Sequence, residues 1–143
     1  MNQDITTPEF VNGHLTEKAN EARKKAEELT ENSYTNKLDF IFDKHRLIKY
    51  ADVLDSVSVK FNQTKNNVEE FTVKTVKTID DEIKAATTIR SELPSSDEQQ
   101  VDEKGMMKRG ENAGEITALV DVKLMVFEIS SNLARKLARQ MNR

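Results

Sequence analysis

The sequence is poor in the residues that build turns and cross-links. It has 143 residues, with no cysteine, no tryptophan, four glycines and two prolines. The absence of cysteine excludes disulfides, thiolate nucleophiles and thiolate metal ligands, although it leaves the redox compartment open. A chain with so little glycine and proline lacks the material for the many turns of an all-β or doubly wound α/β fold. We therefore expect a few long elements.

Signals that direct a chain into or across a membrane are missing as well. Residues 1–4 lack the charged and apolar regions of a signal peptide. No run approaches the roughly 18 to 20 apolar residues of a transmembrane helix. The net charge of −3 gives no global attraction to nucleic acid or to an anionic membrane. We expect a cytoplasmic protein, while export by a secretion system that needs no signal peptide would leave the same absence.

The residues that are present favour helices with two different sides. Hydrophobic residues make up 36% of the chain and charged residues 33%, a mixture that suits long amphipathic helices better than a thick globular core. The sequence therefore predicts an all-α single domain. Its expected form is an elongated helical hairpin, or an irregular helical bundle or coiled coil with a flexible polar connector.

The first expected element is an amphipathic, alanine-rich helix within residues 1–34. Thr6 and Glu9 are spaced as a capping box, and Pro8 falls in the first turn, so the helix should start near Thr6. Alanine favours the helix but buries little area, so this helix must pack closely on a neighbour. Its apolar face is thin and consists of Val11, Leu15, Ala19, Ala22, Ala26 and Leu29.

The second expected element is a long helix over residues 35–93. Apolar residues follow a roughly helical spacing from Leu38 to Leu93, with a gap at Thr64 and Lys65. Unbroken, that helix would span roughly 84 Å. Its apolar steps drift between three and four residues, which predicts an irregular bundle rather than a regular zipper.

A β-hairpin is the alternative for residues 53–79. Val57, Val59 and Phe61 alternate with polar residues, and the polar residues 62–67 could form the turn. That turn contains no glycine, and an isolated two-stranded hairpin is only marginally stable in water. We prefer the helix and keep the hairpin as the alternative.

A connector and a hub helix complete the expected chain. Residues 94–111 begin with Pro94 and contain few large apolar residues, which predicts a flexible connector. Apolar residues crowd together between Ile116 and Ile129, too many for one narrow face of a solvated helix. Residues 112–143 should therefore form a C-terminal helix that other helices surround.

No catalytic, cofactor-binding or metal-binding pattern emerges. His14 and His45 fit no metal or catalytic spacing, and no Glu-x-x-His pair occurs. The glycines at 105, 110 and 114 precede Glu115 rather than the Lys-Ser/Thr of a phosphate-binding loop. We expect no cofactor and no enzymatic activity.

The end of the chain is basic. After Glu128 there is no acidic residue, while Arg135, Lys136, Arg139 and Arg143 follow. The three arginines share one helix face, which could contact the phosphates of nucleic acid or lipid. The ordinary interpretation is a solvated face that complements the helix dipole.

The apolar stripes predict self-association. If the hub helix packs against the long helix, it covers only about half of that length, so the remainder needs another chain. The expected oligomer interface consists of Ile116, Leu119, Val126, Ile129, Leu133, Leu137, Leu54, Phe61, Phe71 and Ile79.

The sequence thus favours a non-enzymatic helical interaction protein. It would be a self-associating structural subunit or adaptor of a larger assembly. A secretion or virion apparatus is one such assembly, suggested only by analogy of fold. The expected partners are a second copy and another protein. The alternative is an accessory nucleic-acid-binding protein that uses a multimerised basic C-terminal helix.

Overall fold

The computed structural model describes residues 3–93 and 101–142. Within these ranges the chain forms α1 (Pro8–Glu28), α2 (Lys37–Gln63), α3 (Val68–Glu92) and α4 (Glu103–Met141), with a 3-10 turn η1 (Glu31–Ser33) after α1. No strand occurs in the described ranges. The predicted all-α bundle is confirmed, and the β-hairpin over residues 53–79 is wrong.

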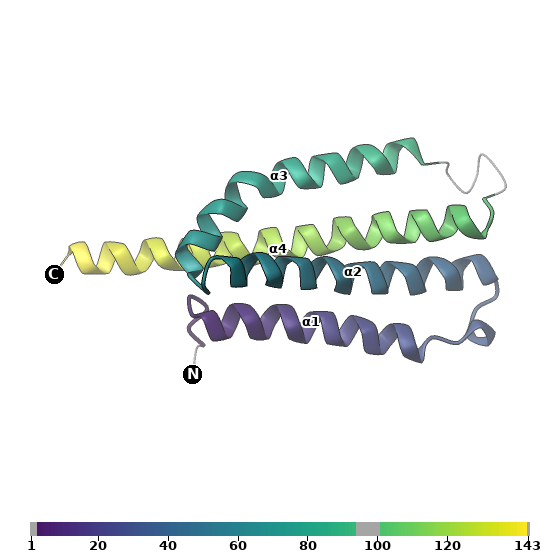
Figure 1. Ribbon diagram of the computed structural model, residues 1–143, viewed down its shortest axis with the longest axis horizontal. Coiled ribbons are helices and arrows are strands. Elements are labelled where there is room, and N and C mark those ends of the chain that lie inside the picture. The colour runs from purple at the N-terminus through teal and green to yellow at the C-terminus, as the bar shows by residue number, and fades with distance from the viewer. Residues whose placement is uncertain (1–2, 94–100, 143) are drawn as a thin grey trace.

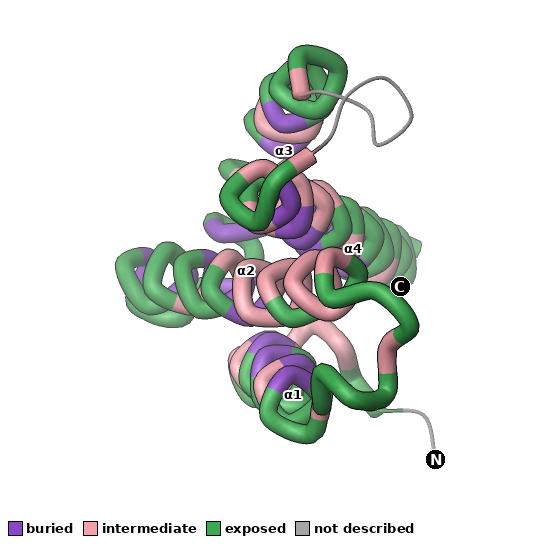
Figure 2. Tube along the Cα trace, turned by 90° about the vertical axis from the view of Figure 1, so that its right-hand side faces the viewer, coloured by how far each residue is buried: buried purple, intermediate pink, exposed green. Residues whose placement is uncertain are grey.

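Successive helices run in opposite directions, so α2 and α4 point the same way (Figure 1). The largest helix–helix interface joins α2 and α4, while α1 packs on α2 and α3 packs on α4. Figure 2 views the bundle end-on, with α1 below α2 and α3 on the opposite side. The two parallel helices therefore form the centre of the molecule, and α1 and α3 cover them from opposite sides.

The first helix begins at a side-chain cap. The Thr7 hydroxyl accepts a hydrogen bond from the Phe10 backbone N–H at 3.2 Å, one residue later than the predicted start at Thr6. Pro8 occupies the first position, where its missing N–H costs nothing. The small face of α1 is buried, including Val11 and Leu15. Its alanines bring α1 close to α2.

The long helix predicted over 35–93 is instead two helices. Lys65 and Asn66 have φ values of 56° and 59°, a left-handed conformation through which a right-handed helix cannot continue. The Asn67 side chain then accepts a hydrogen bond from the Glu70 N–H at 3.0 Å and caps α3. The chain consequently reverses, and α3 returns alongside the bundle. The sequence gap at Thr64 and Lys65 marks this reversal.

The last helix starts earlier than predicted. The Asp102 side chain caps α4 by accepting a hydrogen bond from the Gly105 N–H at 2.8 Å. Residues 103–111, assigned to the flexible connector, are therefore helical, while residues 94–100 lie outside the described ranges. Burial explains the difference, because Met106 is 7% exposed, and Asn112 donates to the Ala86 carbonyl at 2.9 Å.

Two glycines set the distance between α2 and α4. A Cβ added at Gly110 would lie 2.5 Å from the Phe42 carbonyl oxygen. One added at Gly114 would overlap the Arg46 carbonyl oxygen. The glycines are therefore sites of close backbone approach, and Ala118, fully buried one turn later, extends the same small-residue face.

Buried side chains of α2, α3 and α4 meet in the core. The rings of Phe61 and Phe71 lie edge to face with centroids 5.2 Å apart. Val122, Val126 and Ile129 of α4 are at most 1% exposed. Among the described helices, none combines the length and the apolar content that spanning a membrane requires.

Candidate interaction surface

The residues predicted as an oligomer interface lie mostly in the core of one chain. Ile116 and Leu133 are partly buried against that core, and Leu137 is 58% exposed. The remaining seven are at most 5% exposed, namely Leu119, Val126, Ile129, Leu54, Phe61, Phe71 and Ile79. The reversal at residues 64–67 explains this, because it folds α3 over the surface that a second chain was expected to cover. An interface between chains would have to open the core to use these seven.

Different apolar side chains are exposed on α4. Val120, Leu124 and Phe127 are 38%, 63% and 41% exposed. They are three and four residues apart, so they share one side of the helix. The buried residues Val122 and Val126 lie on the opposite side, toward α2 and α3. The three exposed residues therefore form an apolar surface that the bundle does not cover.

This surface continues at heptad spacing along α4. Eight exposed residues alternate three- and four-residue steps, and we call them the free face: Thr117, Val120, Leu124, Phe127, Ser131, Ala134, Ala138 and Met141. Alternating steps of three and four are the spacing of a coiled-coil seam. This seam was not predicted, although its steps can be read from the sequence, because its small members are inconspicuous beside the core residues.

The C-terminal end of α4 extends beyond the other helices (Figure 1). Residues 134–142, which we call the overhang, are all exposed. Of the predicted basic residues, Arg135, Lys136 and Arg139 lie in the overhang, and Arg143 lies outside the described residues. Lys136 donates to Asp4 at 2.8 Å and to Thr6 at 2.6 Å, which ties the N-terminal segment to α4.

The hydrogen bonds at Asp4 also affect its titration. The bond from Lys136, followed by those from Thr6, lowers the pKa of Asp4 well below its usual range. Lys136 is thus engaged within the chain. Arg135 and Arg139, by contrast, form no ion pair with the described residues.

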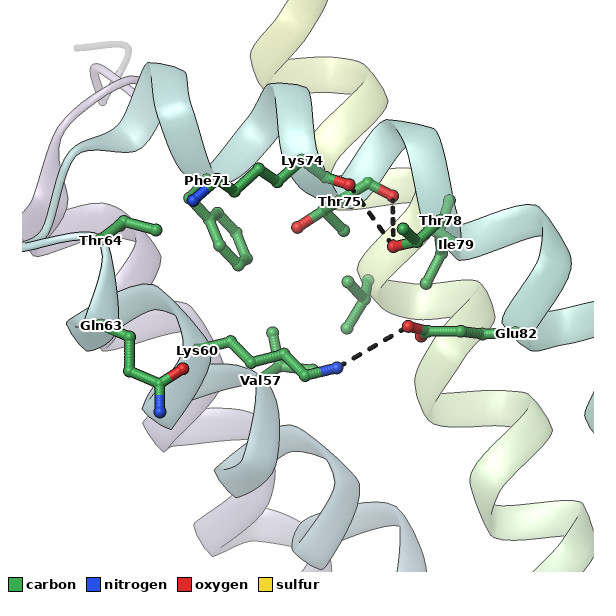
Figure 3. Close-up of a pocket in the computed structure, with 11 residues that line it drawn as sticks. Val57, Lys60, Gln63, Thr64, Phe71, Lys74, Thr75, Thr78, Ile79 and Glu82 are labelled. Atoms are coloured by element: carbon green, nitrogen blue, oxygen red, sulfur yellow. Dashed lines mark hydrogen bonds and ion pairs between the residues drawn. The ribbon is translucent and has the colours of Figure 1, made fainter.

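A pocket of about 230 Å³ opens between α2, α3 and α4 (Figure 3). Its inner wall includes Phe71 and Val57, and an ion pair between Lys60 and Glu82, 3.7 Å apart, crosses its mouth. The opposite charges at the mouth neutralise each other. The pocket can hold a small apolar group, but it brings no base to a nucleophile.

A second hollow of about 520 Å³ separates α3 from the end of α4. Val73, Val76 and Leu137 give it an apolar lining. Thr72 also lines it, is 2% exposed and has a hydroxyl without a hydrogen-bond partner among the described residues. The hollow therefore extends the exposed apolar surface of α4 toward α3.

The two histidines belong to no group of metal-ligating side chains in the part of the chain that the structure describes. The ring of His14 stacks on Phe10 with centroids 5.4 Å apart. His45 Nδ1 lies 4.0 Å from the Glu111 carboxylate on the neighbouring helix. Both side chains thus have local structural contacts.

Comparison of the chain with models of known protein families, with characterised proteins and with solved structures gave no match. We therefore infer its function from the surface of the molecule.

Proposed function

We propose that the chain is a non-enzymatic helical interaction protein that self-associates and serves as a structural subunit or adaptor in a larger assembly. The free face of α4 carries this proposal. It places Val120, Leu124 and Phe127 together on the surface, on the side of the helix that the bundle leaves uncovered. Contiguous apolar patches on otherwise polar proteins are typical of protein–protein contacts. An amphipathic helix face is a common form of such a contact.

The remaining chemistry of the described residues supports an interaction role. The pocket between α2, α3 and α4 has an ion pair at its mouth and no nucleophile held beside a base. Among the described residues no group of three metal-ligating side chains converges. The described surface would then bind another protein without a cofactor. A cytoplasmic location and an assembly of the secretion or virion kind stay predictions from the sequence.

Two aspartate variants separate the surface from the core. Leu124 is 63% exposed and Val126 is fully buried, only two residues apart on the same helix. Leu124→Asp places a charge in solvent and should leave the monomer folded. Val126→Asp buries an unpaired charge, which costs several kcal/mol and should unfold the chain.

Sedimentation velocity and far-ultraviolet circular dichroism measure the two effects. At micromolar concentration the wild type should sediment as an oligomer, and Leu124→Asp should sediment as a monomer with an unchanged helical spectrum. Arg139→Ala should associate like the wild type, because an exposed cation contributes about 1 kcal/mol or less. A wild type that stays monomeric would refute self-association.

The alternative function is accessory binding of nucleic acid by the overhang. Arg135 and Arg139 favour it, since both are exposed and neither forms an ion pair with the described residues. An oligomer would repeat these cations and strengthen the contact with phosphates. Retention on DNA or RNA should then fall steeply with salt and weaken in Arg139→Ala. Retention that is absent at low salt would exclude this alternative.

A further inference from the structure

The free face of α4 has the pattern of a two-stranded coiled coil. Assigning Thr117, Leu124, Ser131 and Ala138 to heptad position a places Val120, Phe127, Ala134 and Met141 at position d. All eight are exposed, so no helix of the same chain occupies the seam. Building on the proposed self-association, we infer that the partner on this face is a second copy of the chain, with the two α4 helices parallel and in register.

Side-chain size supports the parallel register. Three of the large residues of the free face, Val120, Leu124 and Phe127, lie in its first half, whereas Ser131, Ala134 and Ala138 follow and Met141 ends it. In a parallel pair each position meets its own copy, so large residues pack against large ones. The small residues of the second half let the two overhangs approach closely.

Charge supports the same register. Lys123 and Glu128 flank the seam at positions g and e, five residues apart, and a parallel coiled coil brings these two positions together between chains. Lys123 Nζ bonds Asp80 Oδ1 at 2.6 Å, and an ammonium group has further donors for Glu128 of the partner subunit. Glu128 is exposed and has no ion pair with the described residues.

The antiparallel arrangements are less favourable. If the antiparallel helices bring Leu124 against Phe127 of the partner subunit, Asp121 comes to lie opposite Glu128 of the partner subunit. Those like charges repel each other. A shift by one heptad removes that contact, but it places Leu124 opposite Ala134 of the partner subunit and Phe127 opposite Ser131 of the partner subunit. Large apolar residues then face small ones and remain partly exposed.

The overhang also needs a partner. Residues 134–142 are all exposed, and α3 faces them across the hollow that Leu137 and Gln140 line. Helical segments of this length gain most of their stability from packing. In the parallel pair the two overhangs support each other along Ala134, Ala138 and Met141. The seam thus continues from the bundle to the end of the described chain.

Single-cysteine variants test the register, because the chain has no cysteine of its own. Ala138→Cys in the full chain should form a disulfide-linked dimer under mild oxidation, since the paired Cα atoms fall within the roughly 7 Å limit for a disulfide. Gln140→Cys is the matched control, because residue 140 is exposed and lies on nearly the opposite side of the same helix. It should give on the order of tenfold less dimer than Ala138→Cys, for which pairing holds the thiols at millimolar effective concentration.

A mixture of Ala113→Cys and Ala138→Cys tests the antiparallel arrangement. The antiparallel pair centred between Leu124 and Phe127 places residue 113 opposite residue 138, so a mixed disulfide would dominate. The parallel pair predicts that dimers of Ala138→Cys with itself dominate instead. Dominance of the mixed species, or equal cross-linking of Ala138→Cys and Gln140→Cys, would overturn the inference.

Sedimentation of the same variants under reducing conditions separates this inference from the proposed function. Oligomers whose cysteines at 138 fail to cross-link would refute the parallel register and leave self-association intact. Monomers at all concentrations, with no cross-linking, would refute both.

Discussion

The close contact between α2 and α4 predicts the effect of adding one methyl group at Gly114. The new Cβ would overlap the Arg46 carbonyl oxygen and lie 3.0 Å from the Tyr50 nitrogen. Both neighbours are backbone atoms, which cannot rotate away as a flexible side chain can. The normal separation of carbon and carbonyl oxygen is about 3.3 Å or more, so Gly114→Ala must push the two helices apart.

The size of this effect follows from two opposing contributions. Overpacking a tight contact costs roughly 1–3 kcal/mol, and a clash with backbone belongs at the upper end of that range. Replacing glycine by alanine inside a helix raises the free energy of unfolding by up to about 1 kcal/mol, because alanine has the higher helix propensity. We therefore expect Gly114→Ala to lower the free energy of unfolding by about 2 kcal/mol.

Gly13→Ala is the matched control. Gly13 lies within α1, and a Cβ added there meets no atom within 4 Å. This variant should be more stable than the wild type by about 0.5–1 kcal/mol. Urea unfolding followed by circular dichroism, at one fixed protein concentration, measures both variants. If Gly114→Ala is as stable as Gly13→Ala, the backbones of α2 and α4 are not in close contact, and this reasoning is wrong.

Three further variants test single groups. Thr72→Val removes a buried hydroxyl that has no hydrogen-bond partner among the described residues. It should stabilise the chain by about 1 kcal/mol in urea unfolding, and a loss of stability would indicate that the hydroxyl is hydrogen-bonded. Asn112→Ala removes the 2.9 Å bond to the Ala86 carbonyl and should cost about 1 kcal/mol in the same assay, whereas an unchanged midpoint would contradict that bond. Burial, followed by the hydrogen bond to Asp121, raises the pKa of Tyr50 above its ordinary value of 10.0. The unfolded chain therefore releases this proton first, and wild-type stability should fall as pH rises above that value. The stability of Tyr50→Phe should fall less steeply across the same pH range. Equal slopes for the two proteins would show that Tyr50 does not contribute to the pH dependence of stability.

Much of the fold can be predicted from the sequence, because helix faces depend on local spacing. The face of α1 from Val11 to Ala26 is buried, as its helical period predicts. The crowded stretch from Ile116 to Ile129 is helical too, but only one side of it is buried, because Val120, Leu124 and Phe127 are exposed. The reversal at Lys65 and Asn66 was harder to predict, because neither is glycine and both adopt positive φ. Asparagine tolerates that conformation and lysine does so less readily, so local propensity alone does not show where the chain turns.

The role of the glycines and of the free face could not be predicted by the same reasoning. Gly110 lies in the predicted flexible connector and Gly114 in the predicted C-terminal helix, and only the position of α2 shows that both permit close packing. The spacing of apolar residues likewise identified the crowded stretch from Ile116 to Ile129 but did not separate its two sides. Val126 became core and Leu124 became surface because α3 folds back onto α4, a tertiary event that no local pattern encodes.

The most direct measurement is the sedimentation of wild type, Leu124→Asp and Gln140→Asp across micromolar concentrations, with helical content monitored in parallel. The control replaces an exposed residue on the opposite side of α4 and adds the same charge. If the free face of α4 mediates association, the wild type and Gln140→Asp should both be oligomeric. Leu124→Asp should be folded but monomeric. Equal sedimentation of the three folded proteins would contradict it.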